Sequence, residues 1–412
     1  MSDAEKLVAA CGEEASRAAG GLAAAPDGVI DGALRGIAAL LTGQAPAILE
    51  ANAADIERGE ADGLGPGLLD RLRLDEARIA AMARQIGLLA DVPFPPASVF
   101  LGELPGSAGL RLAERRVPVG VVGANFEARP NVTVDVASQL LKSRNAGVLR
   151  TGAAALASAS ALFDRVLTPA LGDAGLDTGA LRLVRTADRE AAVELVRQPR
   201  LIPLVILRGS GDSTRELAAE AARRGVRTLA HADGGAVLYV DRAADQAEVT
   251  RLVTESLDRL GVCNRLNLLL ICSGSWDAML PTALDALRAM EVTASLPPHD
   301  HPLGHEWALD SGREATVTIA PADGPAAAAG IANAETSGLA ACVVTPDPAA
   351  ARAFIDAYRG TGAFWNATPR LLDGFRLRGV PETGINVDHV PGPRGPVTFA
   401  DLCLRQYVVT PA

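Results

Sequence analysis

The feature that most constrains this chain is an alternation of short apolar runs with longer amphipathic segments after residue 118. The runs lie at 119–123, 146–150, 181–184 and 204–207, and the segments between them at 132–141, 156–171 and 190–198. The runs are largely apolar along their whole length, as in parallel strands buried on both faces. Strands that alternate with helices of this length predict a parallel sheet covered by helices on both sides.

A second series of the same kind begins at residue 236. Its strands are predicted at 236–240, 268–271, 341–345 and 363–365, and its helices at 246–260, 276–290 and 348–358. Residues 1 to about 98 instead place apolar residues at three- and four-residue steps, which predicts helices. The stretch from about 295 to 335 is rich in Ala, Pro and Gly and weakly patterned. The sequence therefore predicts two doubly wound α/β lobes.

Composition argues against several functional classes. The formal net charge is −10, whereas a nucleic-acid-binding surface needs clustered Lys and Arg. No run approaches the roughly 18 apolar residues of a membrane helix, and residues 1–6 lack a signal-peptide pattern. The five cysteines are odd in number and have no CxxC spacing, which favours a reducing cytoplasm and predicts no metal site. We expect a small-molecule partner, with no nucleic acid and no membrane.

Cys263 is the residue that most suggests chemistry. It lies in the segment Leu260–Arg265, between a predicted helix and a predicted buried strand. Turns, helix ends and polar neighbours can give a cysteine the thiolate character that a nucleophile needs. A lone cysteine beside a strand is also often an inert core residue. The local sequence leaves both interpretations open.

Residues 126–138, with the sequence FEARPNVTVDVAS, closely resemble a signature of the γ-glutamyl phosphate reductases. These are the glutamate-5-semialdehyde dehydrogenases of proline biosynthesis, within the aldehyde dehydrogenase superfamily. The resemblance continues along most of the chain. Further matching positions lie at 141–142, 145, 149–150, 187–189, 206–211, 231–234, 239–241, 366–368, 370, 373–374 and 382.

The resemblance places Cys263 and Asn264 on the family's catalytic Pro-Ser-Val-Cys-Asn. It implies that the Cys263 thiolate attacks an acyl phosphate, releases phosphate and forms a thioester, which hydride from NADPH reduces to an aldehyde. The oxyanion needs preorganised donors. The candidates are the backbone N–H of Cys263 and the side chain of Asn131 or Asn125, of which Asn131 is our prediction.

The resemblance also suggests residues that bind the substrate. We expect Arg129 and Arg370 to bind a carboxylate or phosphate, and Glu127 to contribute to the same site. A surface or interlobe ion pair is an equally good interpretation of either arginine.

Cofactor contacts are expected from Arg208, Gly209 and Gly211, because a glycine turn before a helix lets backbone N–H groups approach a phosphate. Arg150 and Glu382 complete the predicted NADPH site. A tight strand-to-helix connection and a solvated Glu382 are the alternatives that we keep open.

Departures from the family cluster around the predicted site. Many members carry Lys-Glu for the cofactor ribose where this chain has Ala153 and Ala154, so we expect weakened NADPH binding, with Arg144 or Arg150 as the replacement charge. The family's Ser-Gly-His-Thr-Glu is also replaced, by the segment 337–341. Scaffold residues are kept while residues near the substrate differ. This pattern suggests a changed substrate or loss of hydride transfer.

The resemblance implies an aldehyde-dehydrogenase-like α/β fold with a small β oligomerisation arm. Residues 1–230 with 366–395 are predicted to form the N-terminal helices and nucleotide-binding lobe, 231–365 the catalytic lobe, and 107–117 with 396–412 the arm. We expect a homodimer or homotetramer that reduces γ-glutamyl phosphate or a close analogue. The alternatives are a relative that reduces or transfers another activated acyl group, and a catalytically silent binding homologue.

Overall fold

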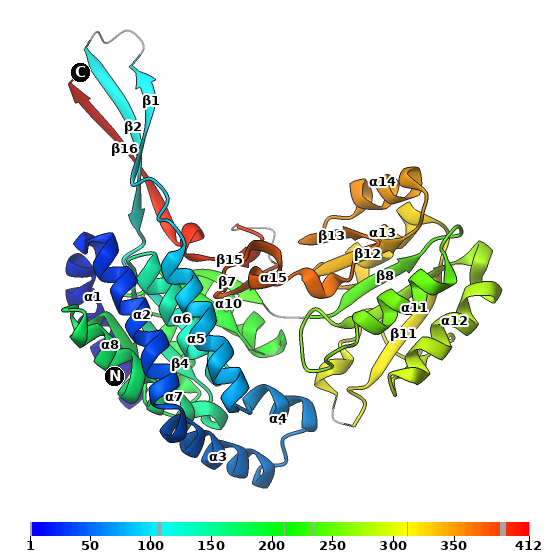
Figure 1. Cartoon of the computed structure of the whole chain (residues 1–412), viewed down its shortest axis with the longest axis horizontal. Helices are drawn as coiled ribbons and strands as arrows, with labels where there is room; N and C mark the ends of the chain where they lie inside the picture. Colours follow the sequence, from blue (N-terminus) through cyan, green and yellow to red (C-terminus); the bar gives the residue numbers. More distant parts are fainter. Residues whose placement is uncertain are drawn as a thin grey trace.

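The structure is a computed structural model that describes residues 2–104, 109–209, 211–231, 234–310, 312–387 and 393–411. Two α/β lobes stand side by side, and a long β-arm projects from the first of them (Figure 1). Within the described residues, no single helix is long and apolar enough to cross a membrane. The helices α2 (Asp27–Gly43) and α3 (Ala45–Ala61) meet that length and composition only as a pair bent by 69°.

The first lobe is built on a parallel five-stranded sheet in the order β5-β4-β3-β6-β7. Its strands are β3 (Val121–Phe126), β4 (Ala146–Thr151), β5 (Leu181–Leu183), β6 (Leu204–Arg208) and β7 (Arg227–His231). The first four confirm the predicted series. β7 was not predicted, because this edge strand begins Arg-Thr and lacks the continuous apolar run of a central strand.

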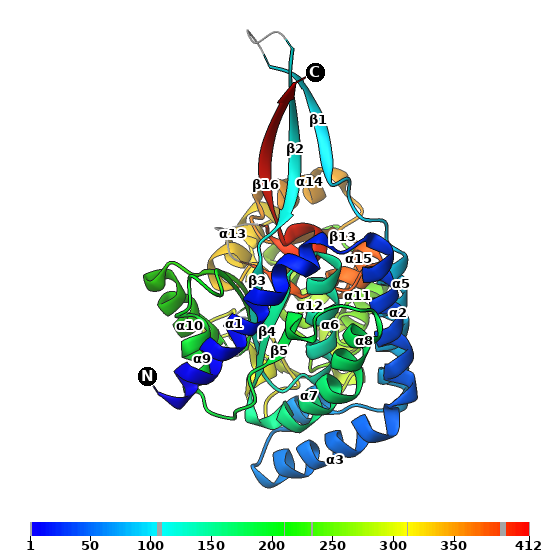
Figure 2. The same cartoon turned by 90° about the vertical axis from the view of Figure 1, so that its left-hand side faces the viewer.

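Helices cover both faces of this sheet, as predicted (Figure 2). One face packs against α1 (Asp3–Ala24), α9 (Glu190–Leu195) and α10 (Gly211–Arg224). The other packs against α2 (Asp27–Gly43), α5 (Glu76–Asp91), α6 (Pro130–Lys142), α7 (Leu156–Leu162) and α8 (Thr168–Asp173). The helices α3 (Ala45–Ala61) and α4 (Pro66–Leu72) extend from this layer toward the second lobe (Figure 1).

The second lobe contains a parallel six-stranded sheet in the order β10-β11-β9-β8-β12-β13. Its strands are β8 (Ala236–Val240), β9 (Leu266–Cys272), β10 (Thr293–Ser295), β11 (Thr316–Ala322), β12 (Ala340–Val344) and β13 (Gly362–Trp365). The helices α11 (Gln246–Glu255) and α12 (Trp276–Ala289) cover one face, and α13 (Pro325–Glu335) and α14 (Pro348–Ala357) the other.

The weakly patterned stretch at 295–335 contains β11 and α13. The buried face of α13 consists of Ala328, Ala329 and Ala332, which pack closely on the sheet. Because alanine occurs on both faces of this helix, its sequence shows little difference between the buried and the exposed face at the 3.6-residue period. This is why the pattern did not show α13.

The arm is an antiparallel sheet of β1 (Ser98–Glu103), β2 (Leu110–Pro118) and β16 (Cys403–Pro411). β1 was not predicted, and residues 107–108 of the predicted arm lie outside the described residues. Residues 396–397 belong to β15 (Gly395–Val397), which pairs with β14 (Gly384–Asn386) instead of the arm. Between β13 and β14 the chain passes through α15 (Gly374–Arg378) and returns to the first lobe.

Candidate active site

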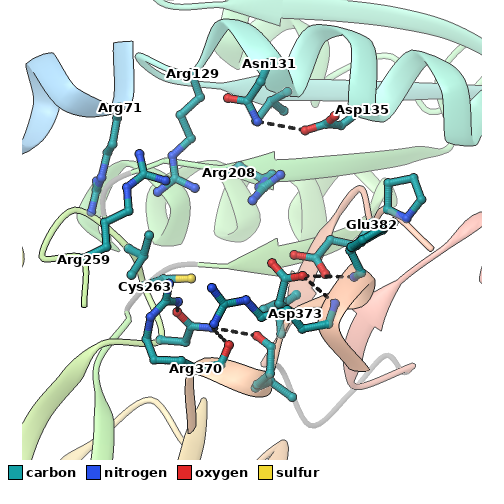
Figure 3. Close-up of a pocket in the computed structure, with 18 of the residues that line it drawn as sticks. Arg71, Arg129, Asn131, Asp135, Arg208, Arg259, Cys263, Arg370, Asp373 and Glu382 are labelled. Carbon is teal, nitrogen blue, oxygen red and sulfur yellow. Dashed lines mark hydrogen bonds between the residues drawn. The ribbon is translucent and has the colours of Figure 1, made fainter. Parts of the chain in front are cut away.

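A cavity of about 350 Å³ lies between the lobes, where α6, the end of β6 and the loop before β9 face one another (Figure 3). Charged side chains dominate its lining. They are the arginines Arg71, Arg129, Arg208, Arg259, Arg370 and Arg376, and the acids Asp135, Asp373 and Glu382. Figure 3 shows Arg71, Arg129 and Arg259 on one side and the three acids on the other.

Cys263 lies in the loop between α11 and β9 and is half-buried in the wall of this cavity (Figure 3). Its backbone oxygen accepts a hydrogen bond from the N–H of Gly235 at 2.6 Å. Of the five cysteines, all of which the structure describes, only Cys263 lines the cavity. Burial raises the pKa of Cys342 to about 12 and raises that of Cys11 as well, so these thiols stay protonated.

Three of the arginines, which we call the arginine trio, are Arg71, Arg129 and Arg208. In the described part of the chain, none of them forms an ion pair with a carboxylate. The Arg71 Nε donates to the Gly261 backbone oxygen at 2.7 Å, and the Arg208 Nη1 to the Thr383 oxygen at 3.0 Å. The Arg208 Nε is buried without a partner. Burial, together with the charges of Arg71 and Arg208, lowers the pKa of Arg129 to about 9. Unbalanced positive charge of this kind favours an anionic ligand.

The other three arginines are paired with acids. Arg259 contacts Asp70 at 2.7 Å, while Arg370 and Arg376 contact Asp258 at 2.6 and 3.7 Å. Because each of them has a carboxylate partner, although Arg370 and Arg376 share Asp258, these arginines attract a further anion less strongly than the trio does.

Asn264 joins Arg370 to the nucleophile loop. Its Nδ2 donates to the backbone oxygens of Arg370 and Leu372 at 3.2 and 3.0 Å, and its Oδ1 accepts from the Arg370 guanidinium. The side chain is therefore fully engaged with the segment that returns to the first lobe. This geometry holds the Cys263 loop against residues 370–372.

Two acids of the opposite wall, Asp135 and Glu382, have raised pKa values. Burial raises the pKa of Asp135 to about 6, although Asn131 donates to Asp135 at 2.9 Å. Burial and the nearby charge of Asp373 raise the pKa of Glu382 to about 8. Glu382 accepts a hydrogen bond from the backbone N–H of Gly374, and Asp373 caps α15.

A second cavity, of about 650 Å³, lies at the carboxyl ends of β3 and β4. Asn125, Glu127, Arg150 and Arg189 line it, together with Ala153, Ala154 and Ser213. Arg150 donates to Asn125 at 3.2 Å and to the Asp188 oxygen at 3.0 Å, and its Nε is buried without a partner. The Glu127 carboxylate lies beside Gly209, near the amino end of α10, and accepts from Ser213 at 3.4 Å.

Comparison with known proteins agrees with this arrangement. A model of the aldehyde dehydrogenase family matches residues 71–304. The gamma-glutamyl phosphate reductase of Paramagnetospirillum magneticum is 31% identical over 99% of this chain and 97% of its own length. That of Chloroflexus aggregans is 34% identical over 93% and 94%. The chain belongs to the gamma-glutamyl phosphate reductases of the aldehyde dehydrogenase family.

Solved structures extend the comparison to the fold. The gamma-glutamyl phosphate reductase of Thermotoga maritima superposes with a TM-score of 0.86, at 25% identity and 98% coverage of both chains. An acetylating aldehyde dehydrogenase from Geobacillus thermoglucosidasius reaches 0.74 at 15% identity, over 99% of this chain and 97% of its own. The predicted two-lobed fold is therefore confirmed.

In the structure, the predicted site residues are divided between the two cavities. Cys263, Asn264, Asn131, Arg129 and Arg370 meet in the first cavity, as expected for one site. Arg208 and Glu382, which we expected at the cofactor, line this first cavity as well.

Glu127, which we expected at the substrate, lies in the second cavity and does not line the first. Arg150 is in the second cavity, where we expected a cofactor. Gly211 begins α10, and Ser210 lies outside the described residues, as do residues 232–233 of the resemblance. Arg144 pairs with Asp27 and stacks on Phe94, so it is not the replacement charge that we considered.

Sequence reasoning missed several residues that line the cavities. Arg71 lies at the end of α4, where it has the appearance of the polar face of an amphipathic helix. Asp135 lies within the resemblance, but no local feature marks it as part of a site. Arg189 was noted only as part of a matching connection, and it lines the second cavity without an ion-pair partner among the described residues.

Proposed function

We propose that this protein reduces an acyl phosphate to an aldehyde through a thioester on Cys263, with γ-glutamyl phosphate or a close analogue as the substrate. The observation that carries the proposal is the placement of the Cys263 thiol in one cavity with the unpaired arginine trio. Arg71, Arg129 and Arg208 offer forked donors that match the oxygens of a phosphate or carboxylate.

In the first step, the Cys263 thiolate attacks the acyl carbon. The bond from carbon to the phosphate oxygen breaks, and inorganic phosphate leaves with the electron pair. The arginine trio stabilises the negative charge that develops on that leaving group. A thioester on Cys263 is the product of this step, as in covalent catalysis generally.

The oxyanion that forms on the acyl oxygen needs a donor close to Cys263. Asn131 lines the same cavity, and its amide carries two hydrogens, of which Asp135 accepts one. The second hydrogen, with the backbone N–H of Cys263, is our proposed donor pair. Asn125 is unsuitable, because it lines the second cavity and not the one that contains Cys263. Asn264 acts by positioning the Cys263 loop.

Both signs of charge in the cavity support an amino-acid substrate. The arginine trio suits its phosphate and carboxylate, and Asp135 and Asp373 on the opposite wall suit an ammonium group (Figure 3). This arrangement favours an acyl phosphate that retains a free amino-acid head over a simple fatty acyl group.

We propose that NADPH binds in the second cavity. Its fit rests on the buried, unpartnered Nε of Arg150, on the alanine-lined wall and on the start of α10 at Gly211. The Gly209 and Gly211 backbone would hold its phosphates, Glu127 its hydroxyl groups and Arg189 its 2′-phosphate. When bound, NADPH supplies the hydride that reduces the thioester to the aldehyde.

A burst experiment in the reverse direction tests the function. Glutamate 5-semialdehyde and NADP⁺ without phosphate should give one NADPH per active subunit, because the thioester then has no acceptor. Mass spectrometry should find the acyl group on Cys263, and added phosphate should start steady turnover. Cys263→Ala should give neither burst nor adduct. A wild-type protein with no burst and no adduct would exclude the reductase.

We also propose that the arm joins two copies of the chain. Its two outer strands, β1 and β16, expose the apolar side chains of Val99, Phe100, Leu101, Leu404, Tyr407 and Val409. An exposed apolar sheet of this kind favours coverage by another subunit. This supports a homodimer or a dimer of dimers. The five unpaired cysteines fit the cytoplasmic location predicted from the sequence.

A further inference from the structure

Glu306 lies behind the nucleophile, outside the cavity lining. Its Oε2 accepts a hydrogen bond from the backbone N–H of Gly234 at 2.9 Å. A Cβ atom at Gly234 would lie 2.7 Å from a Glu306 carboxylate oxygen, 2.7 Å from the Cys263 backbone oxygen and 2.9 Å from the Cys263 Cα. Gly234 therefore lies between the Glu306 carboxylate and the Cys263 backbone, where there is no room for a side chain.

Buried hydrogen bonds fix Glu306 in this position. Asn267, in β9, donates to the His305 backbone oxygen at 2.7 Å and accepts from the Trp307 N–H at 3.3 Å. The Trp307 ring is fully buried and donates to Thr318 at 2.9 Å. Because the residues on both sides of Glu306 are anchored to the sheet, the carboxylate has little freedom to move away.

Glu306 also acts on the arginines of the cavity. Burial lowers the pKa of Arg71 and Arg129, and the negative charge of Glu306 opposes that lowering for both. Its carboxylate lies directly behind the Cys263 loop, which lines the same cavity as the trio, so it offsets part of the trio's positive charge without occupying the cavity. It acts on the buried Arg265 as well.

We infer that Glu306 is a positioning residue that fixes the Gly234–Cys263 contact and that its charge limits how tightly the arginine trio holds phosphate. The inference rests on the proposed function, in which phosphate is the first product. A trio without a counter-charge would retain that product, so the carboxylate favours its release.

Replacement of Glu306 by glutamine separates the two roles, because the amide oxygen still accepts from Gly234 while the charge is lost. A unit charge about 10 Å from an anion, at an effective dielectric constant of about 20, changes its binding roughly tenfold. We expect Glu306→Gln to bind inorganic phosphate roughly five- to tenfold more tightly on this basis.

Isothermal titration of the full chain with inorganic phosphate measures this directly. Phosphate should also inhibit the variant at lower concentrations, with kcat reduced more than KM.

Glu314→Gln is the matched control. The negative charge of Glu314, like that of Glu306, raises the pKa of Arg265. The main charges that shift the pKa of Arg71 and Arg129 include Glu306 but not Glu314. Its phosphate affinity should equal that of the wild type. Glu306→Ala should bind phosphate more tightly too, and should also lose thermal stability with its hydrogen bond.

The outcomes distinguish the inference from the proposed function. If the wild type binds phosphate and Glu306→Gln binds it no more tightly than Glu314→Gln, Glu306 is only structural and the inference is wrong. If the wild type binds no phosphate and shows no burst with glutamate 5-semialdehyde, the proposed function itself fails.

Discussion

Replacing Arg129 by glutamine should weaken anion binding and stabilise the empty protein at the same time. A charge-assisted hydrogen bond contributes about 1.5–3 kcal/mol, so phosphate should bind roughly 10- to 150-fold more weakly. The gain in stability follows from the pKa of about 9 instead of 12.5. At about 1.4 kcal/mol per pH unit, this sets an upper bound of about 5 kcal/mol on the cost of the charge. Because Arg129 is partly exposed and its alkyl chain packs in the cavity, we expect a gain of about 1–2 kcal/mol.

The pH dependence of this gain has a definite sign. Arg129 is a base whose pKa is lower in the folded protein than in the unfolded chain. Between about 9 and 12.5, the unfolded chain therefore binds more protons, and the free energy of unfolding of the wild type rises with pH. The variant lacks this rise. Its advantage in stability should be complete below pH 9 and should shrink as the pH increases through that value.

Titration with inorganic phosphate measures the first effect, and thermal unfolding from neutral to alkaline pH measures the second. Arg376→Gln is the control, because Arg376 lines the same cavity but lies 3.7 Å from the carboxylate of Asp258. Its phosphate affinity should change much less. If both variants lose affinity equally, the unpaired trio is not the anion site. If Arg129→Gln lowers the thermal midpoint, the charge of Arg129 does not destabilise the empty protein.

Three further predictions concern the acid wall, the cofactor and the arm. Glu382 has a pKa of about 8 in the folded protein and near 4.5 in the unfolded chain, so its protonation stabilises the fold fully below pH 4.5. This stabilisation is lost as the pH rises through about 8. Glu382→Gln should abolish that loss in thermal unfolding. Ala153→Lys should tighten NADPH binding about tenfold without affecting NADH binding, whereas Arg189→Gln should weaken only the binding of NADPH. Equal changes for both nucleotides in calorimetry would contradict the proposed NADPH site in the second cavity. The double variant Phe100→Asp with Tyr407→Asp should yield monomers in light scattering at micromolar concentration, while a persistent dimer would refute the arm interface.

Much of the fold was predictable because its central strands are continuous apolar runs. β3, β4, β8 and β9 are buried along their whole length, and the sequence shows them directly. The elements that were missed lack such contrast. β7 is an edge strand with polar residues, β1 lies in an exposed arm, and α13 buries only alanine.

The site was less predictable, because its parts come from distant segments. Cys263 and Arg129 were found through the resemblance, since both lie in or beside matching motifs. Arg71, from an N-terminal helix, reaches the same cavity only because α4 extends toward the second lobe. Glu306 lies within the weakly patterned stretch at 295–335, and no neighbour in the sequence links it to the nucleophile. The misplacement of Glu127 has a similar origin, because adjacent residues at the end of β3 face different cavities.

The pairing of β16 with β2 determines when the arm can form during synthesis of the chain. Residues 403–411 pair with 110–118, so β16 completes a sheet whose other strands are synthesised nearly three hundred residues earlier. The β1–β2 hairpin alone is a two-stranded ribbon, which is marginal in water. The three-stranded arm therefore forms only after the residues of both lobes have been synthesised. If the arm joins two copies as we propose, nascent chains on one messenger lack a finished docking surface until β16 is made, which protects them from premature association.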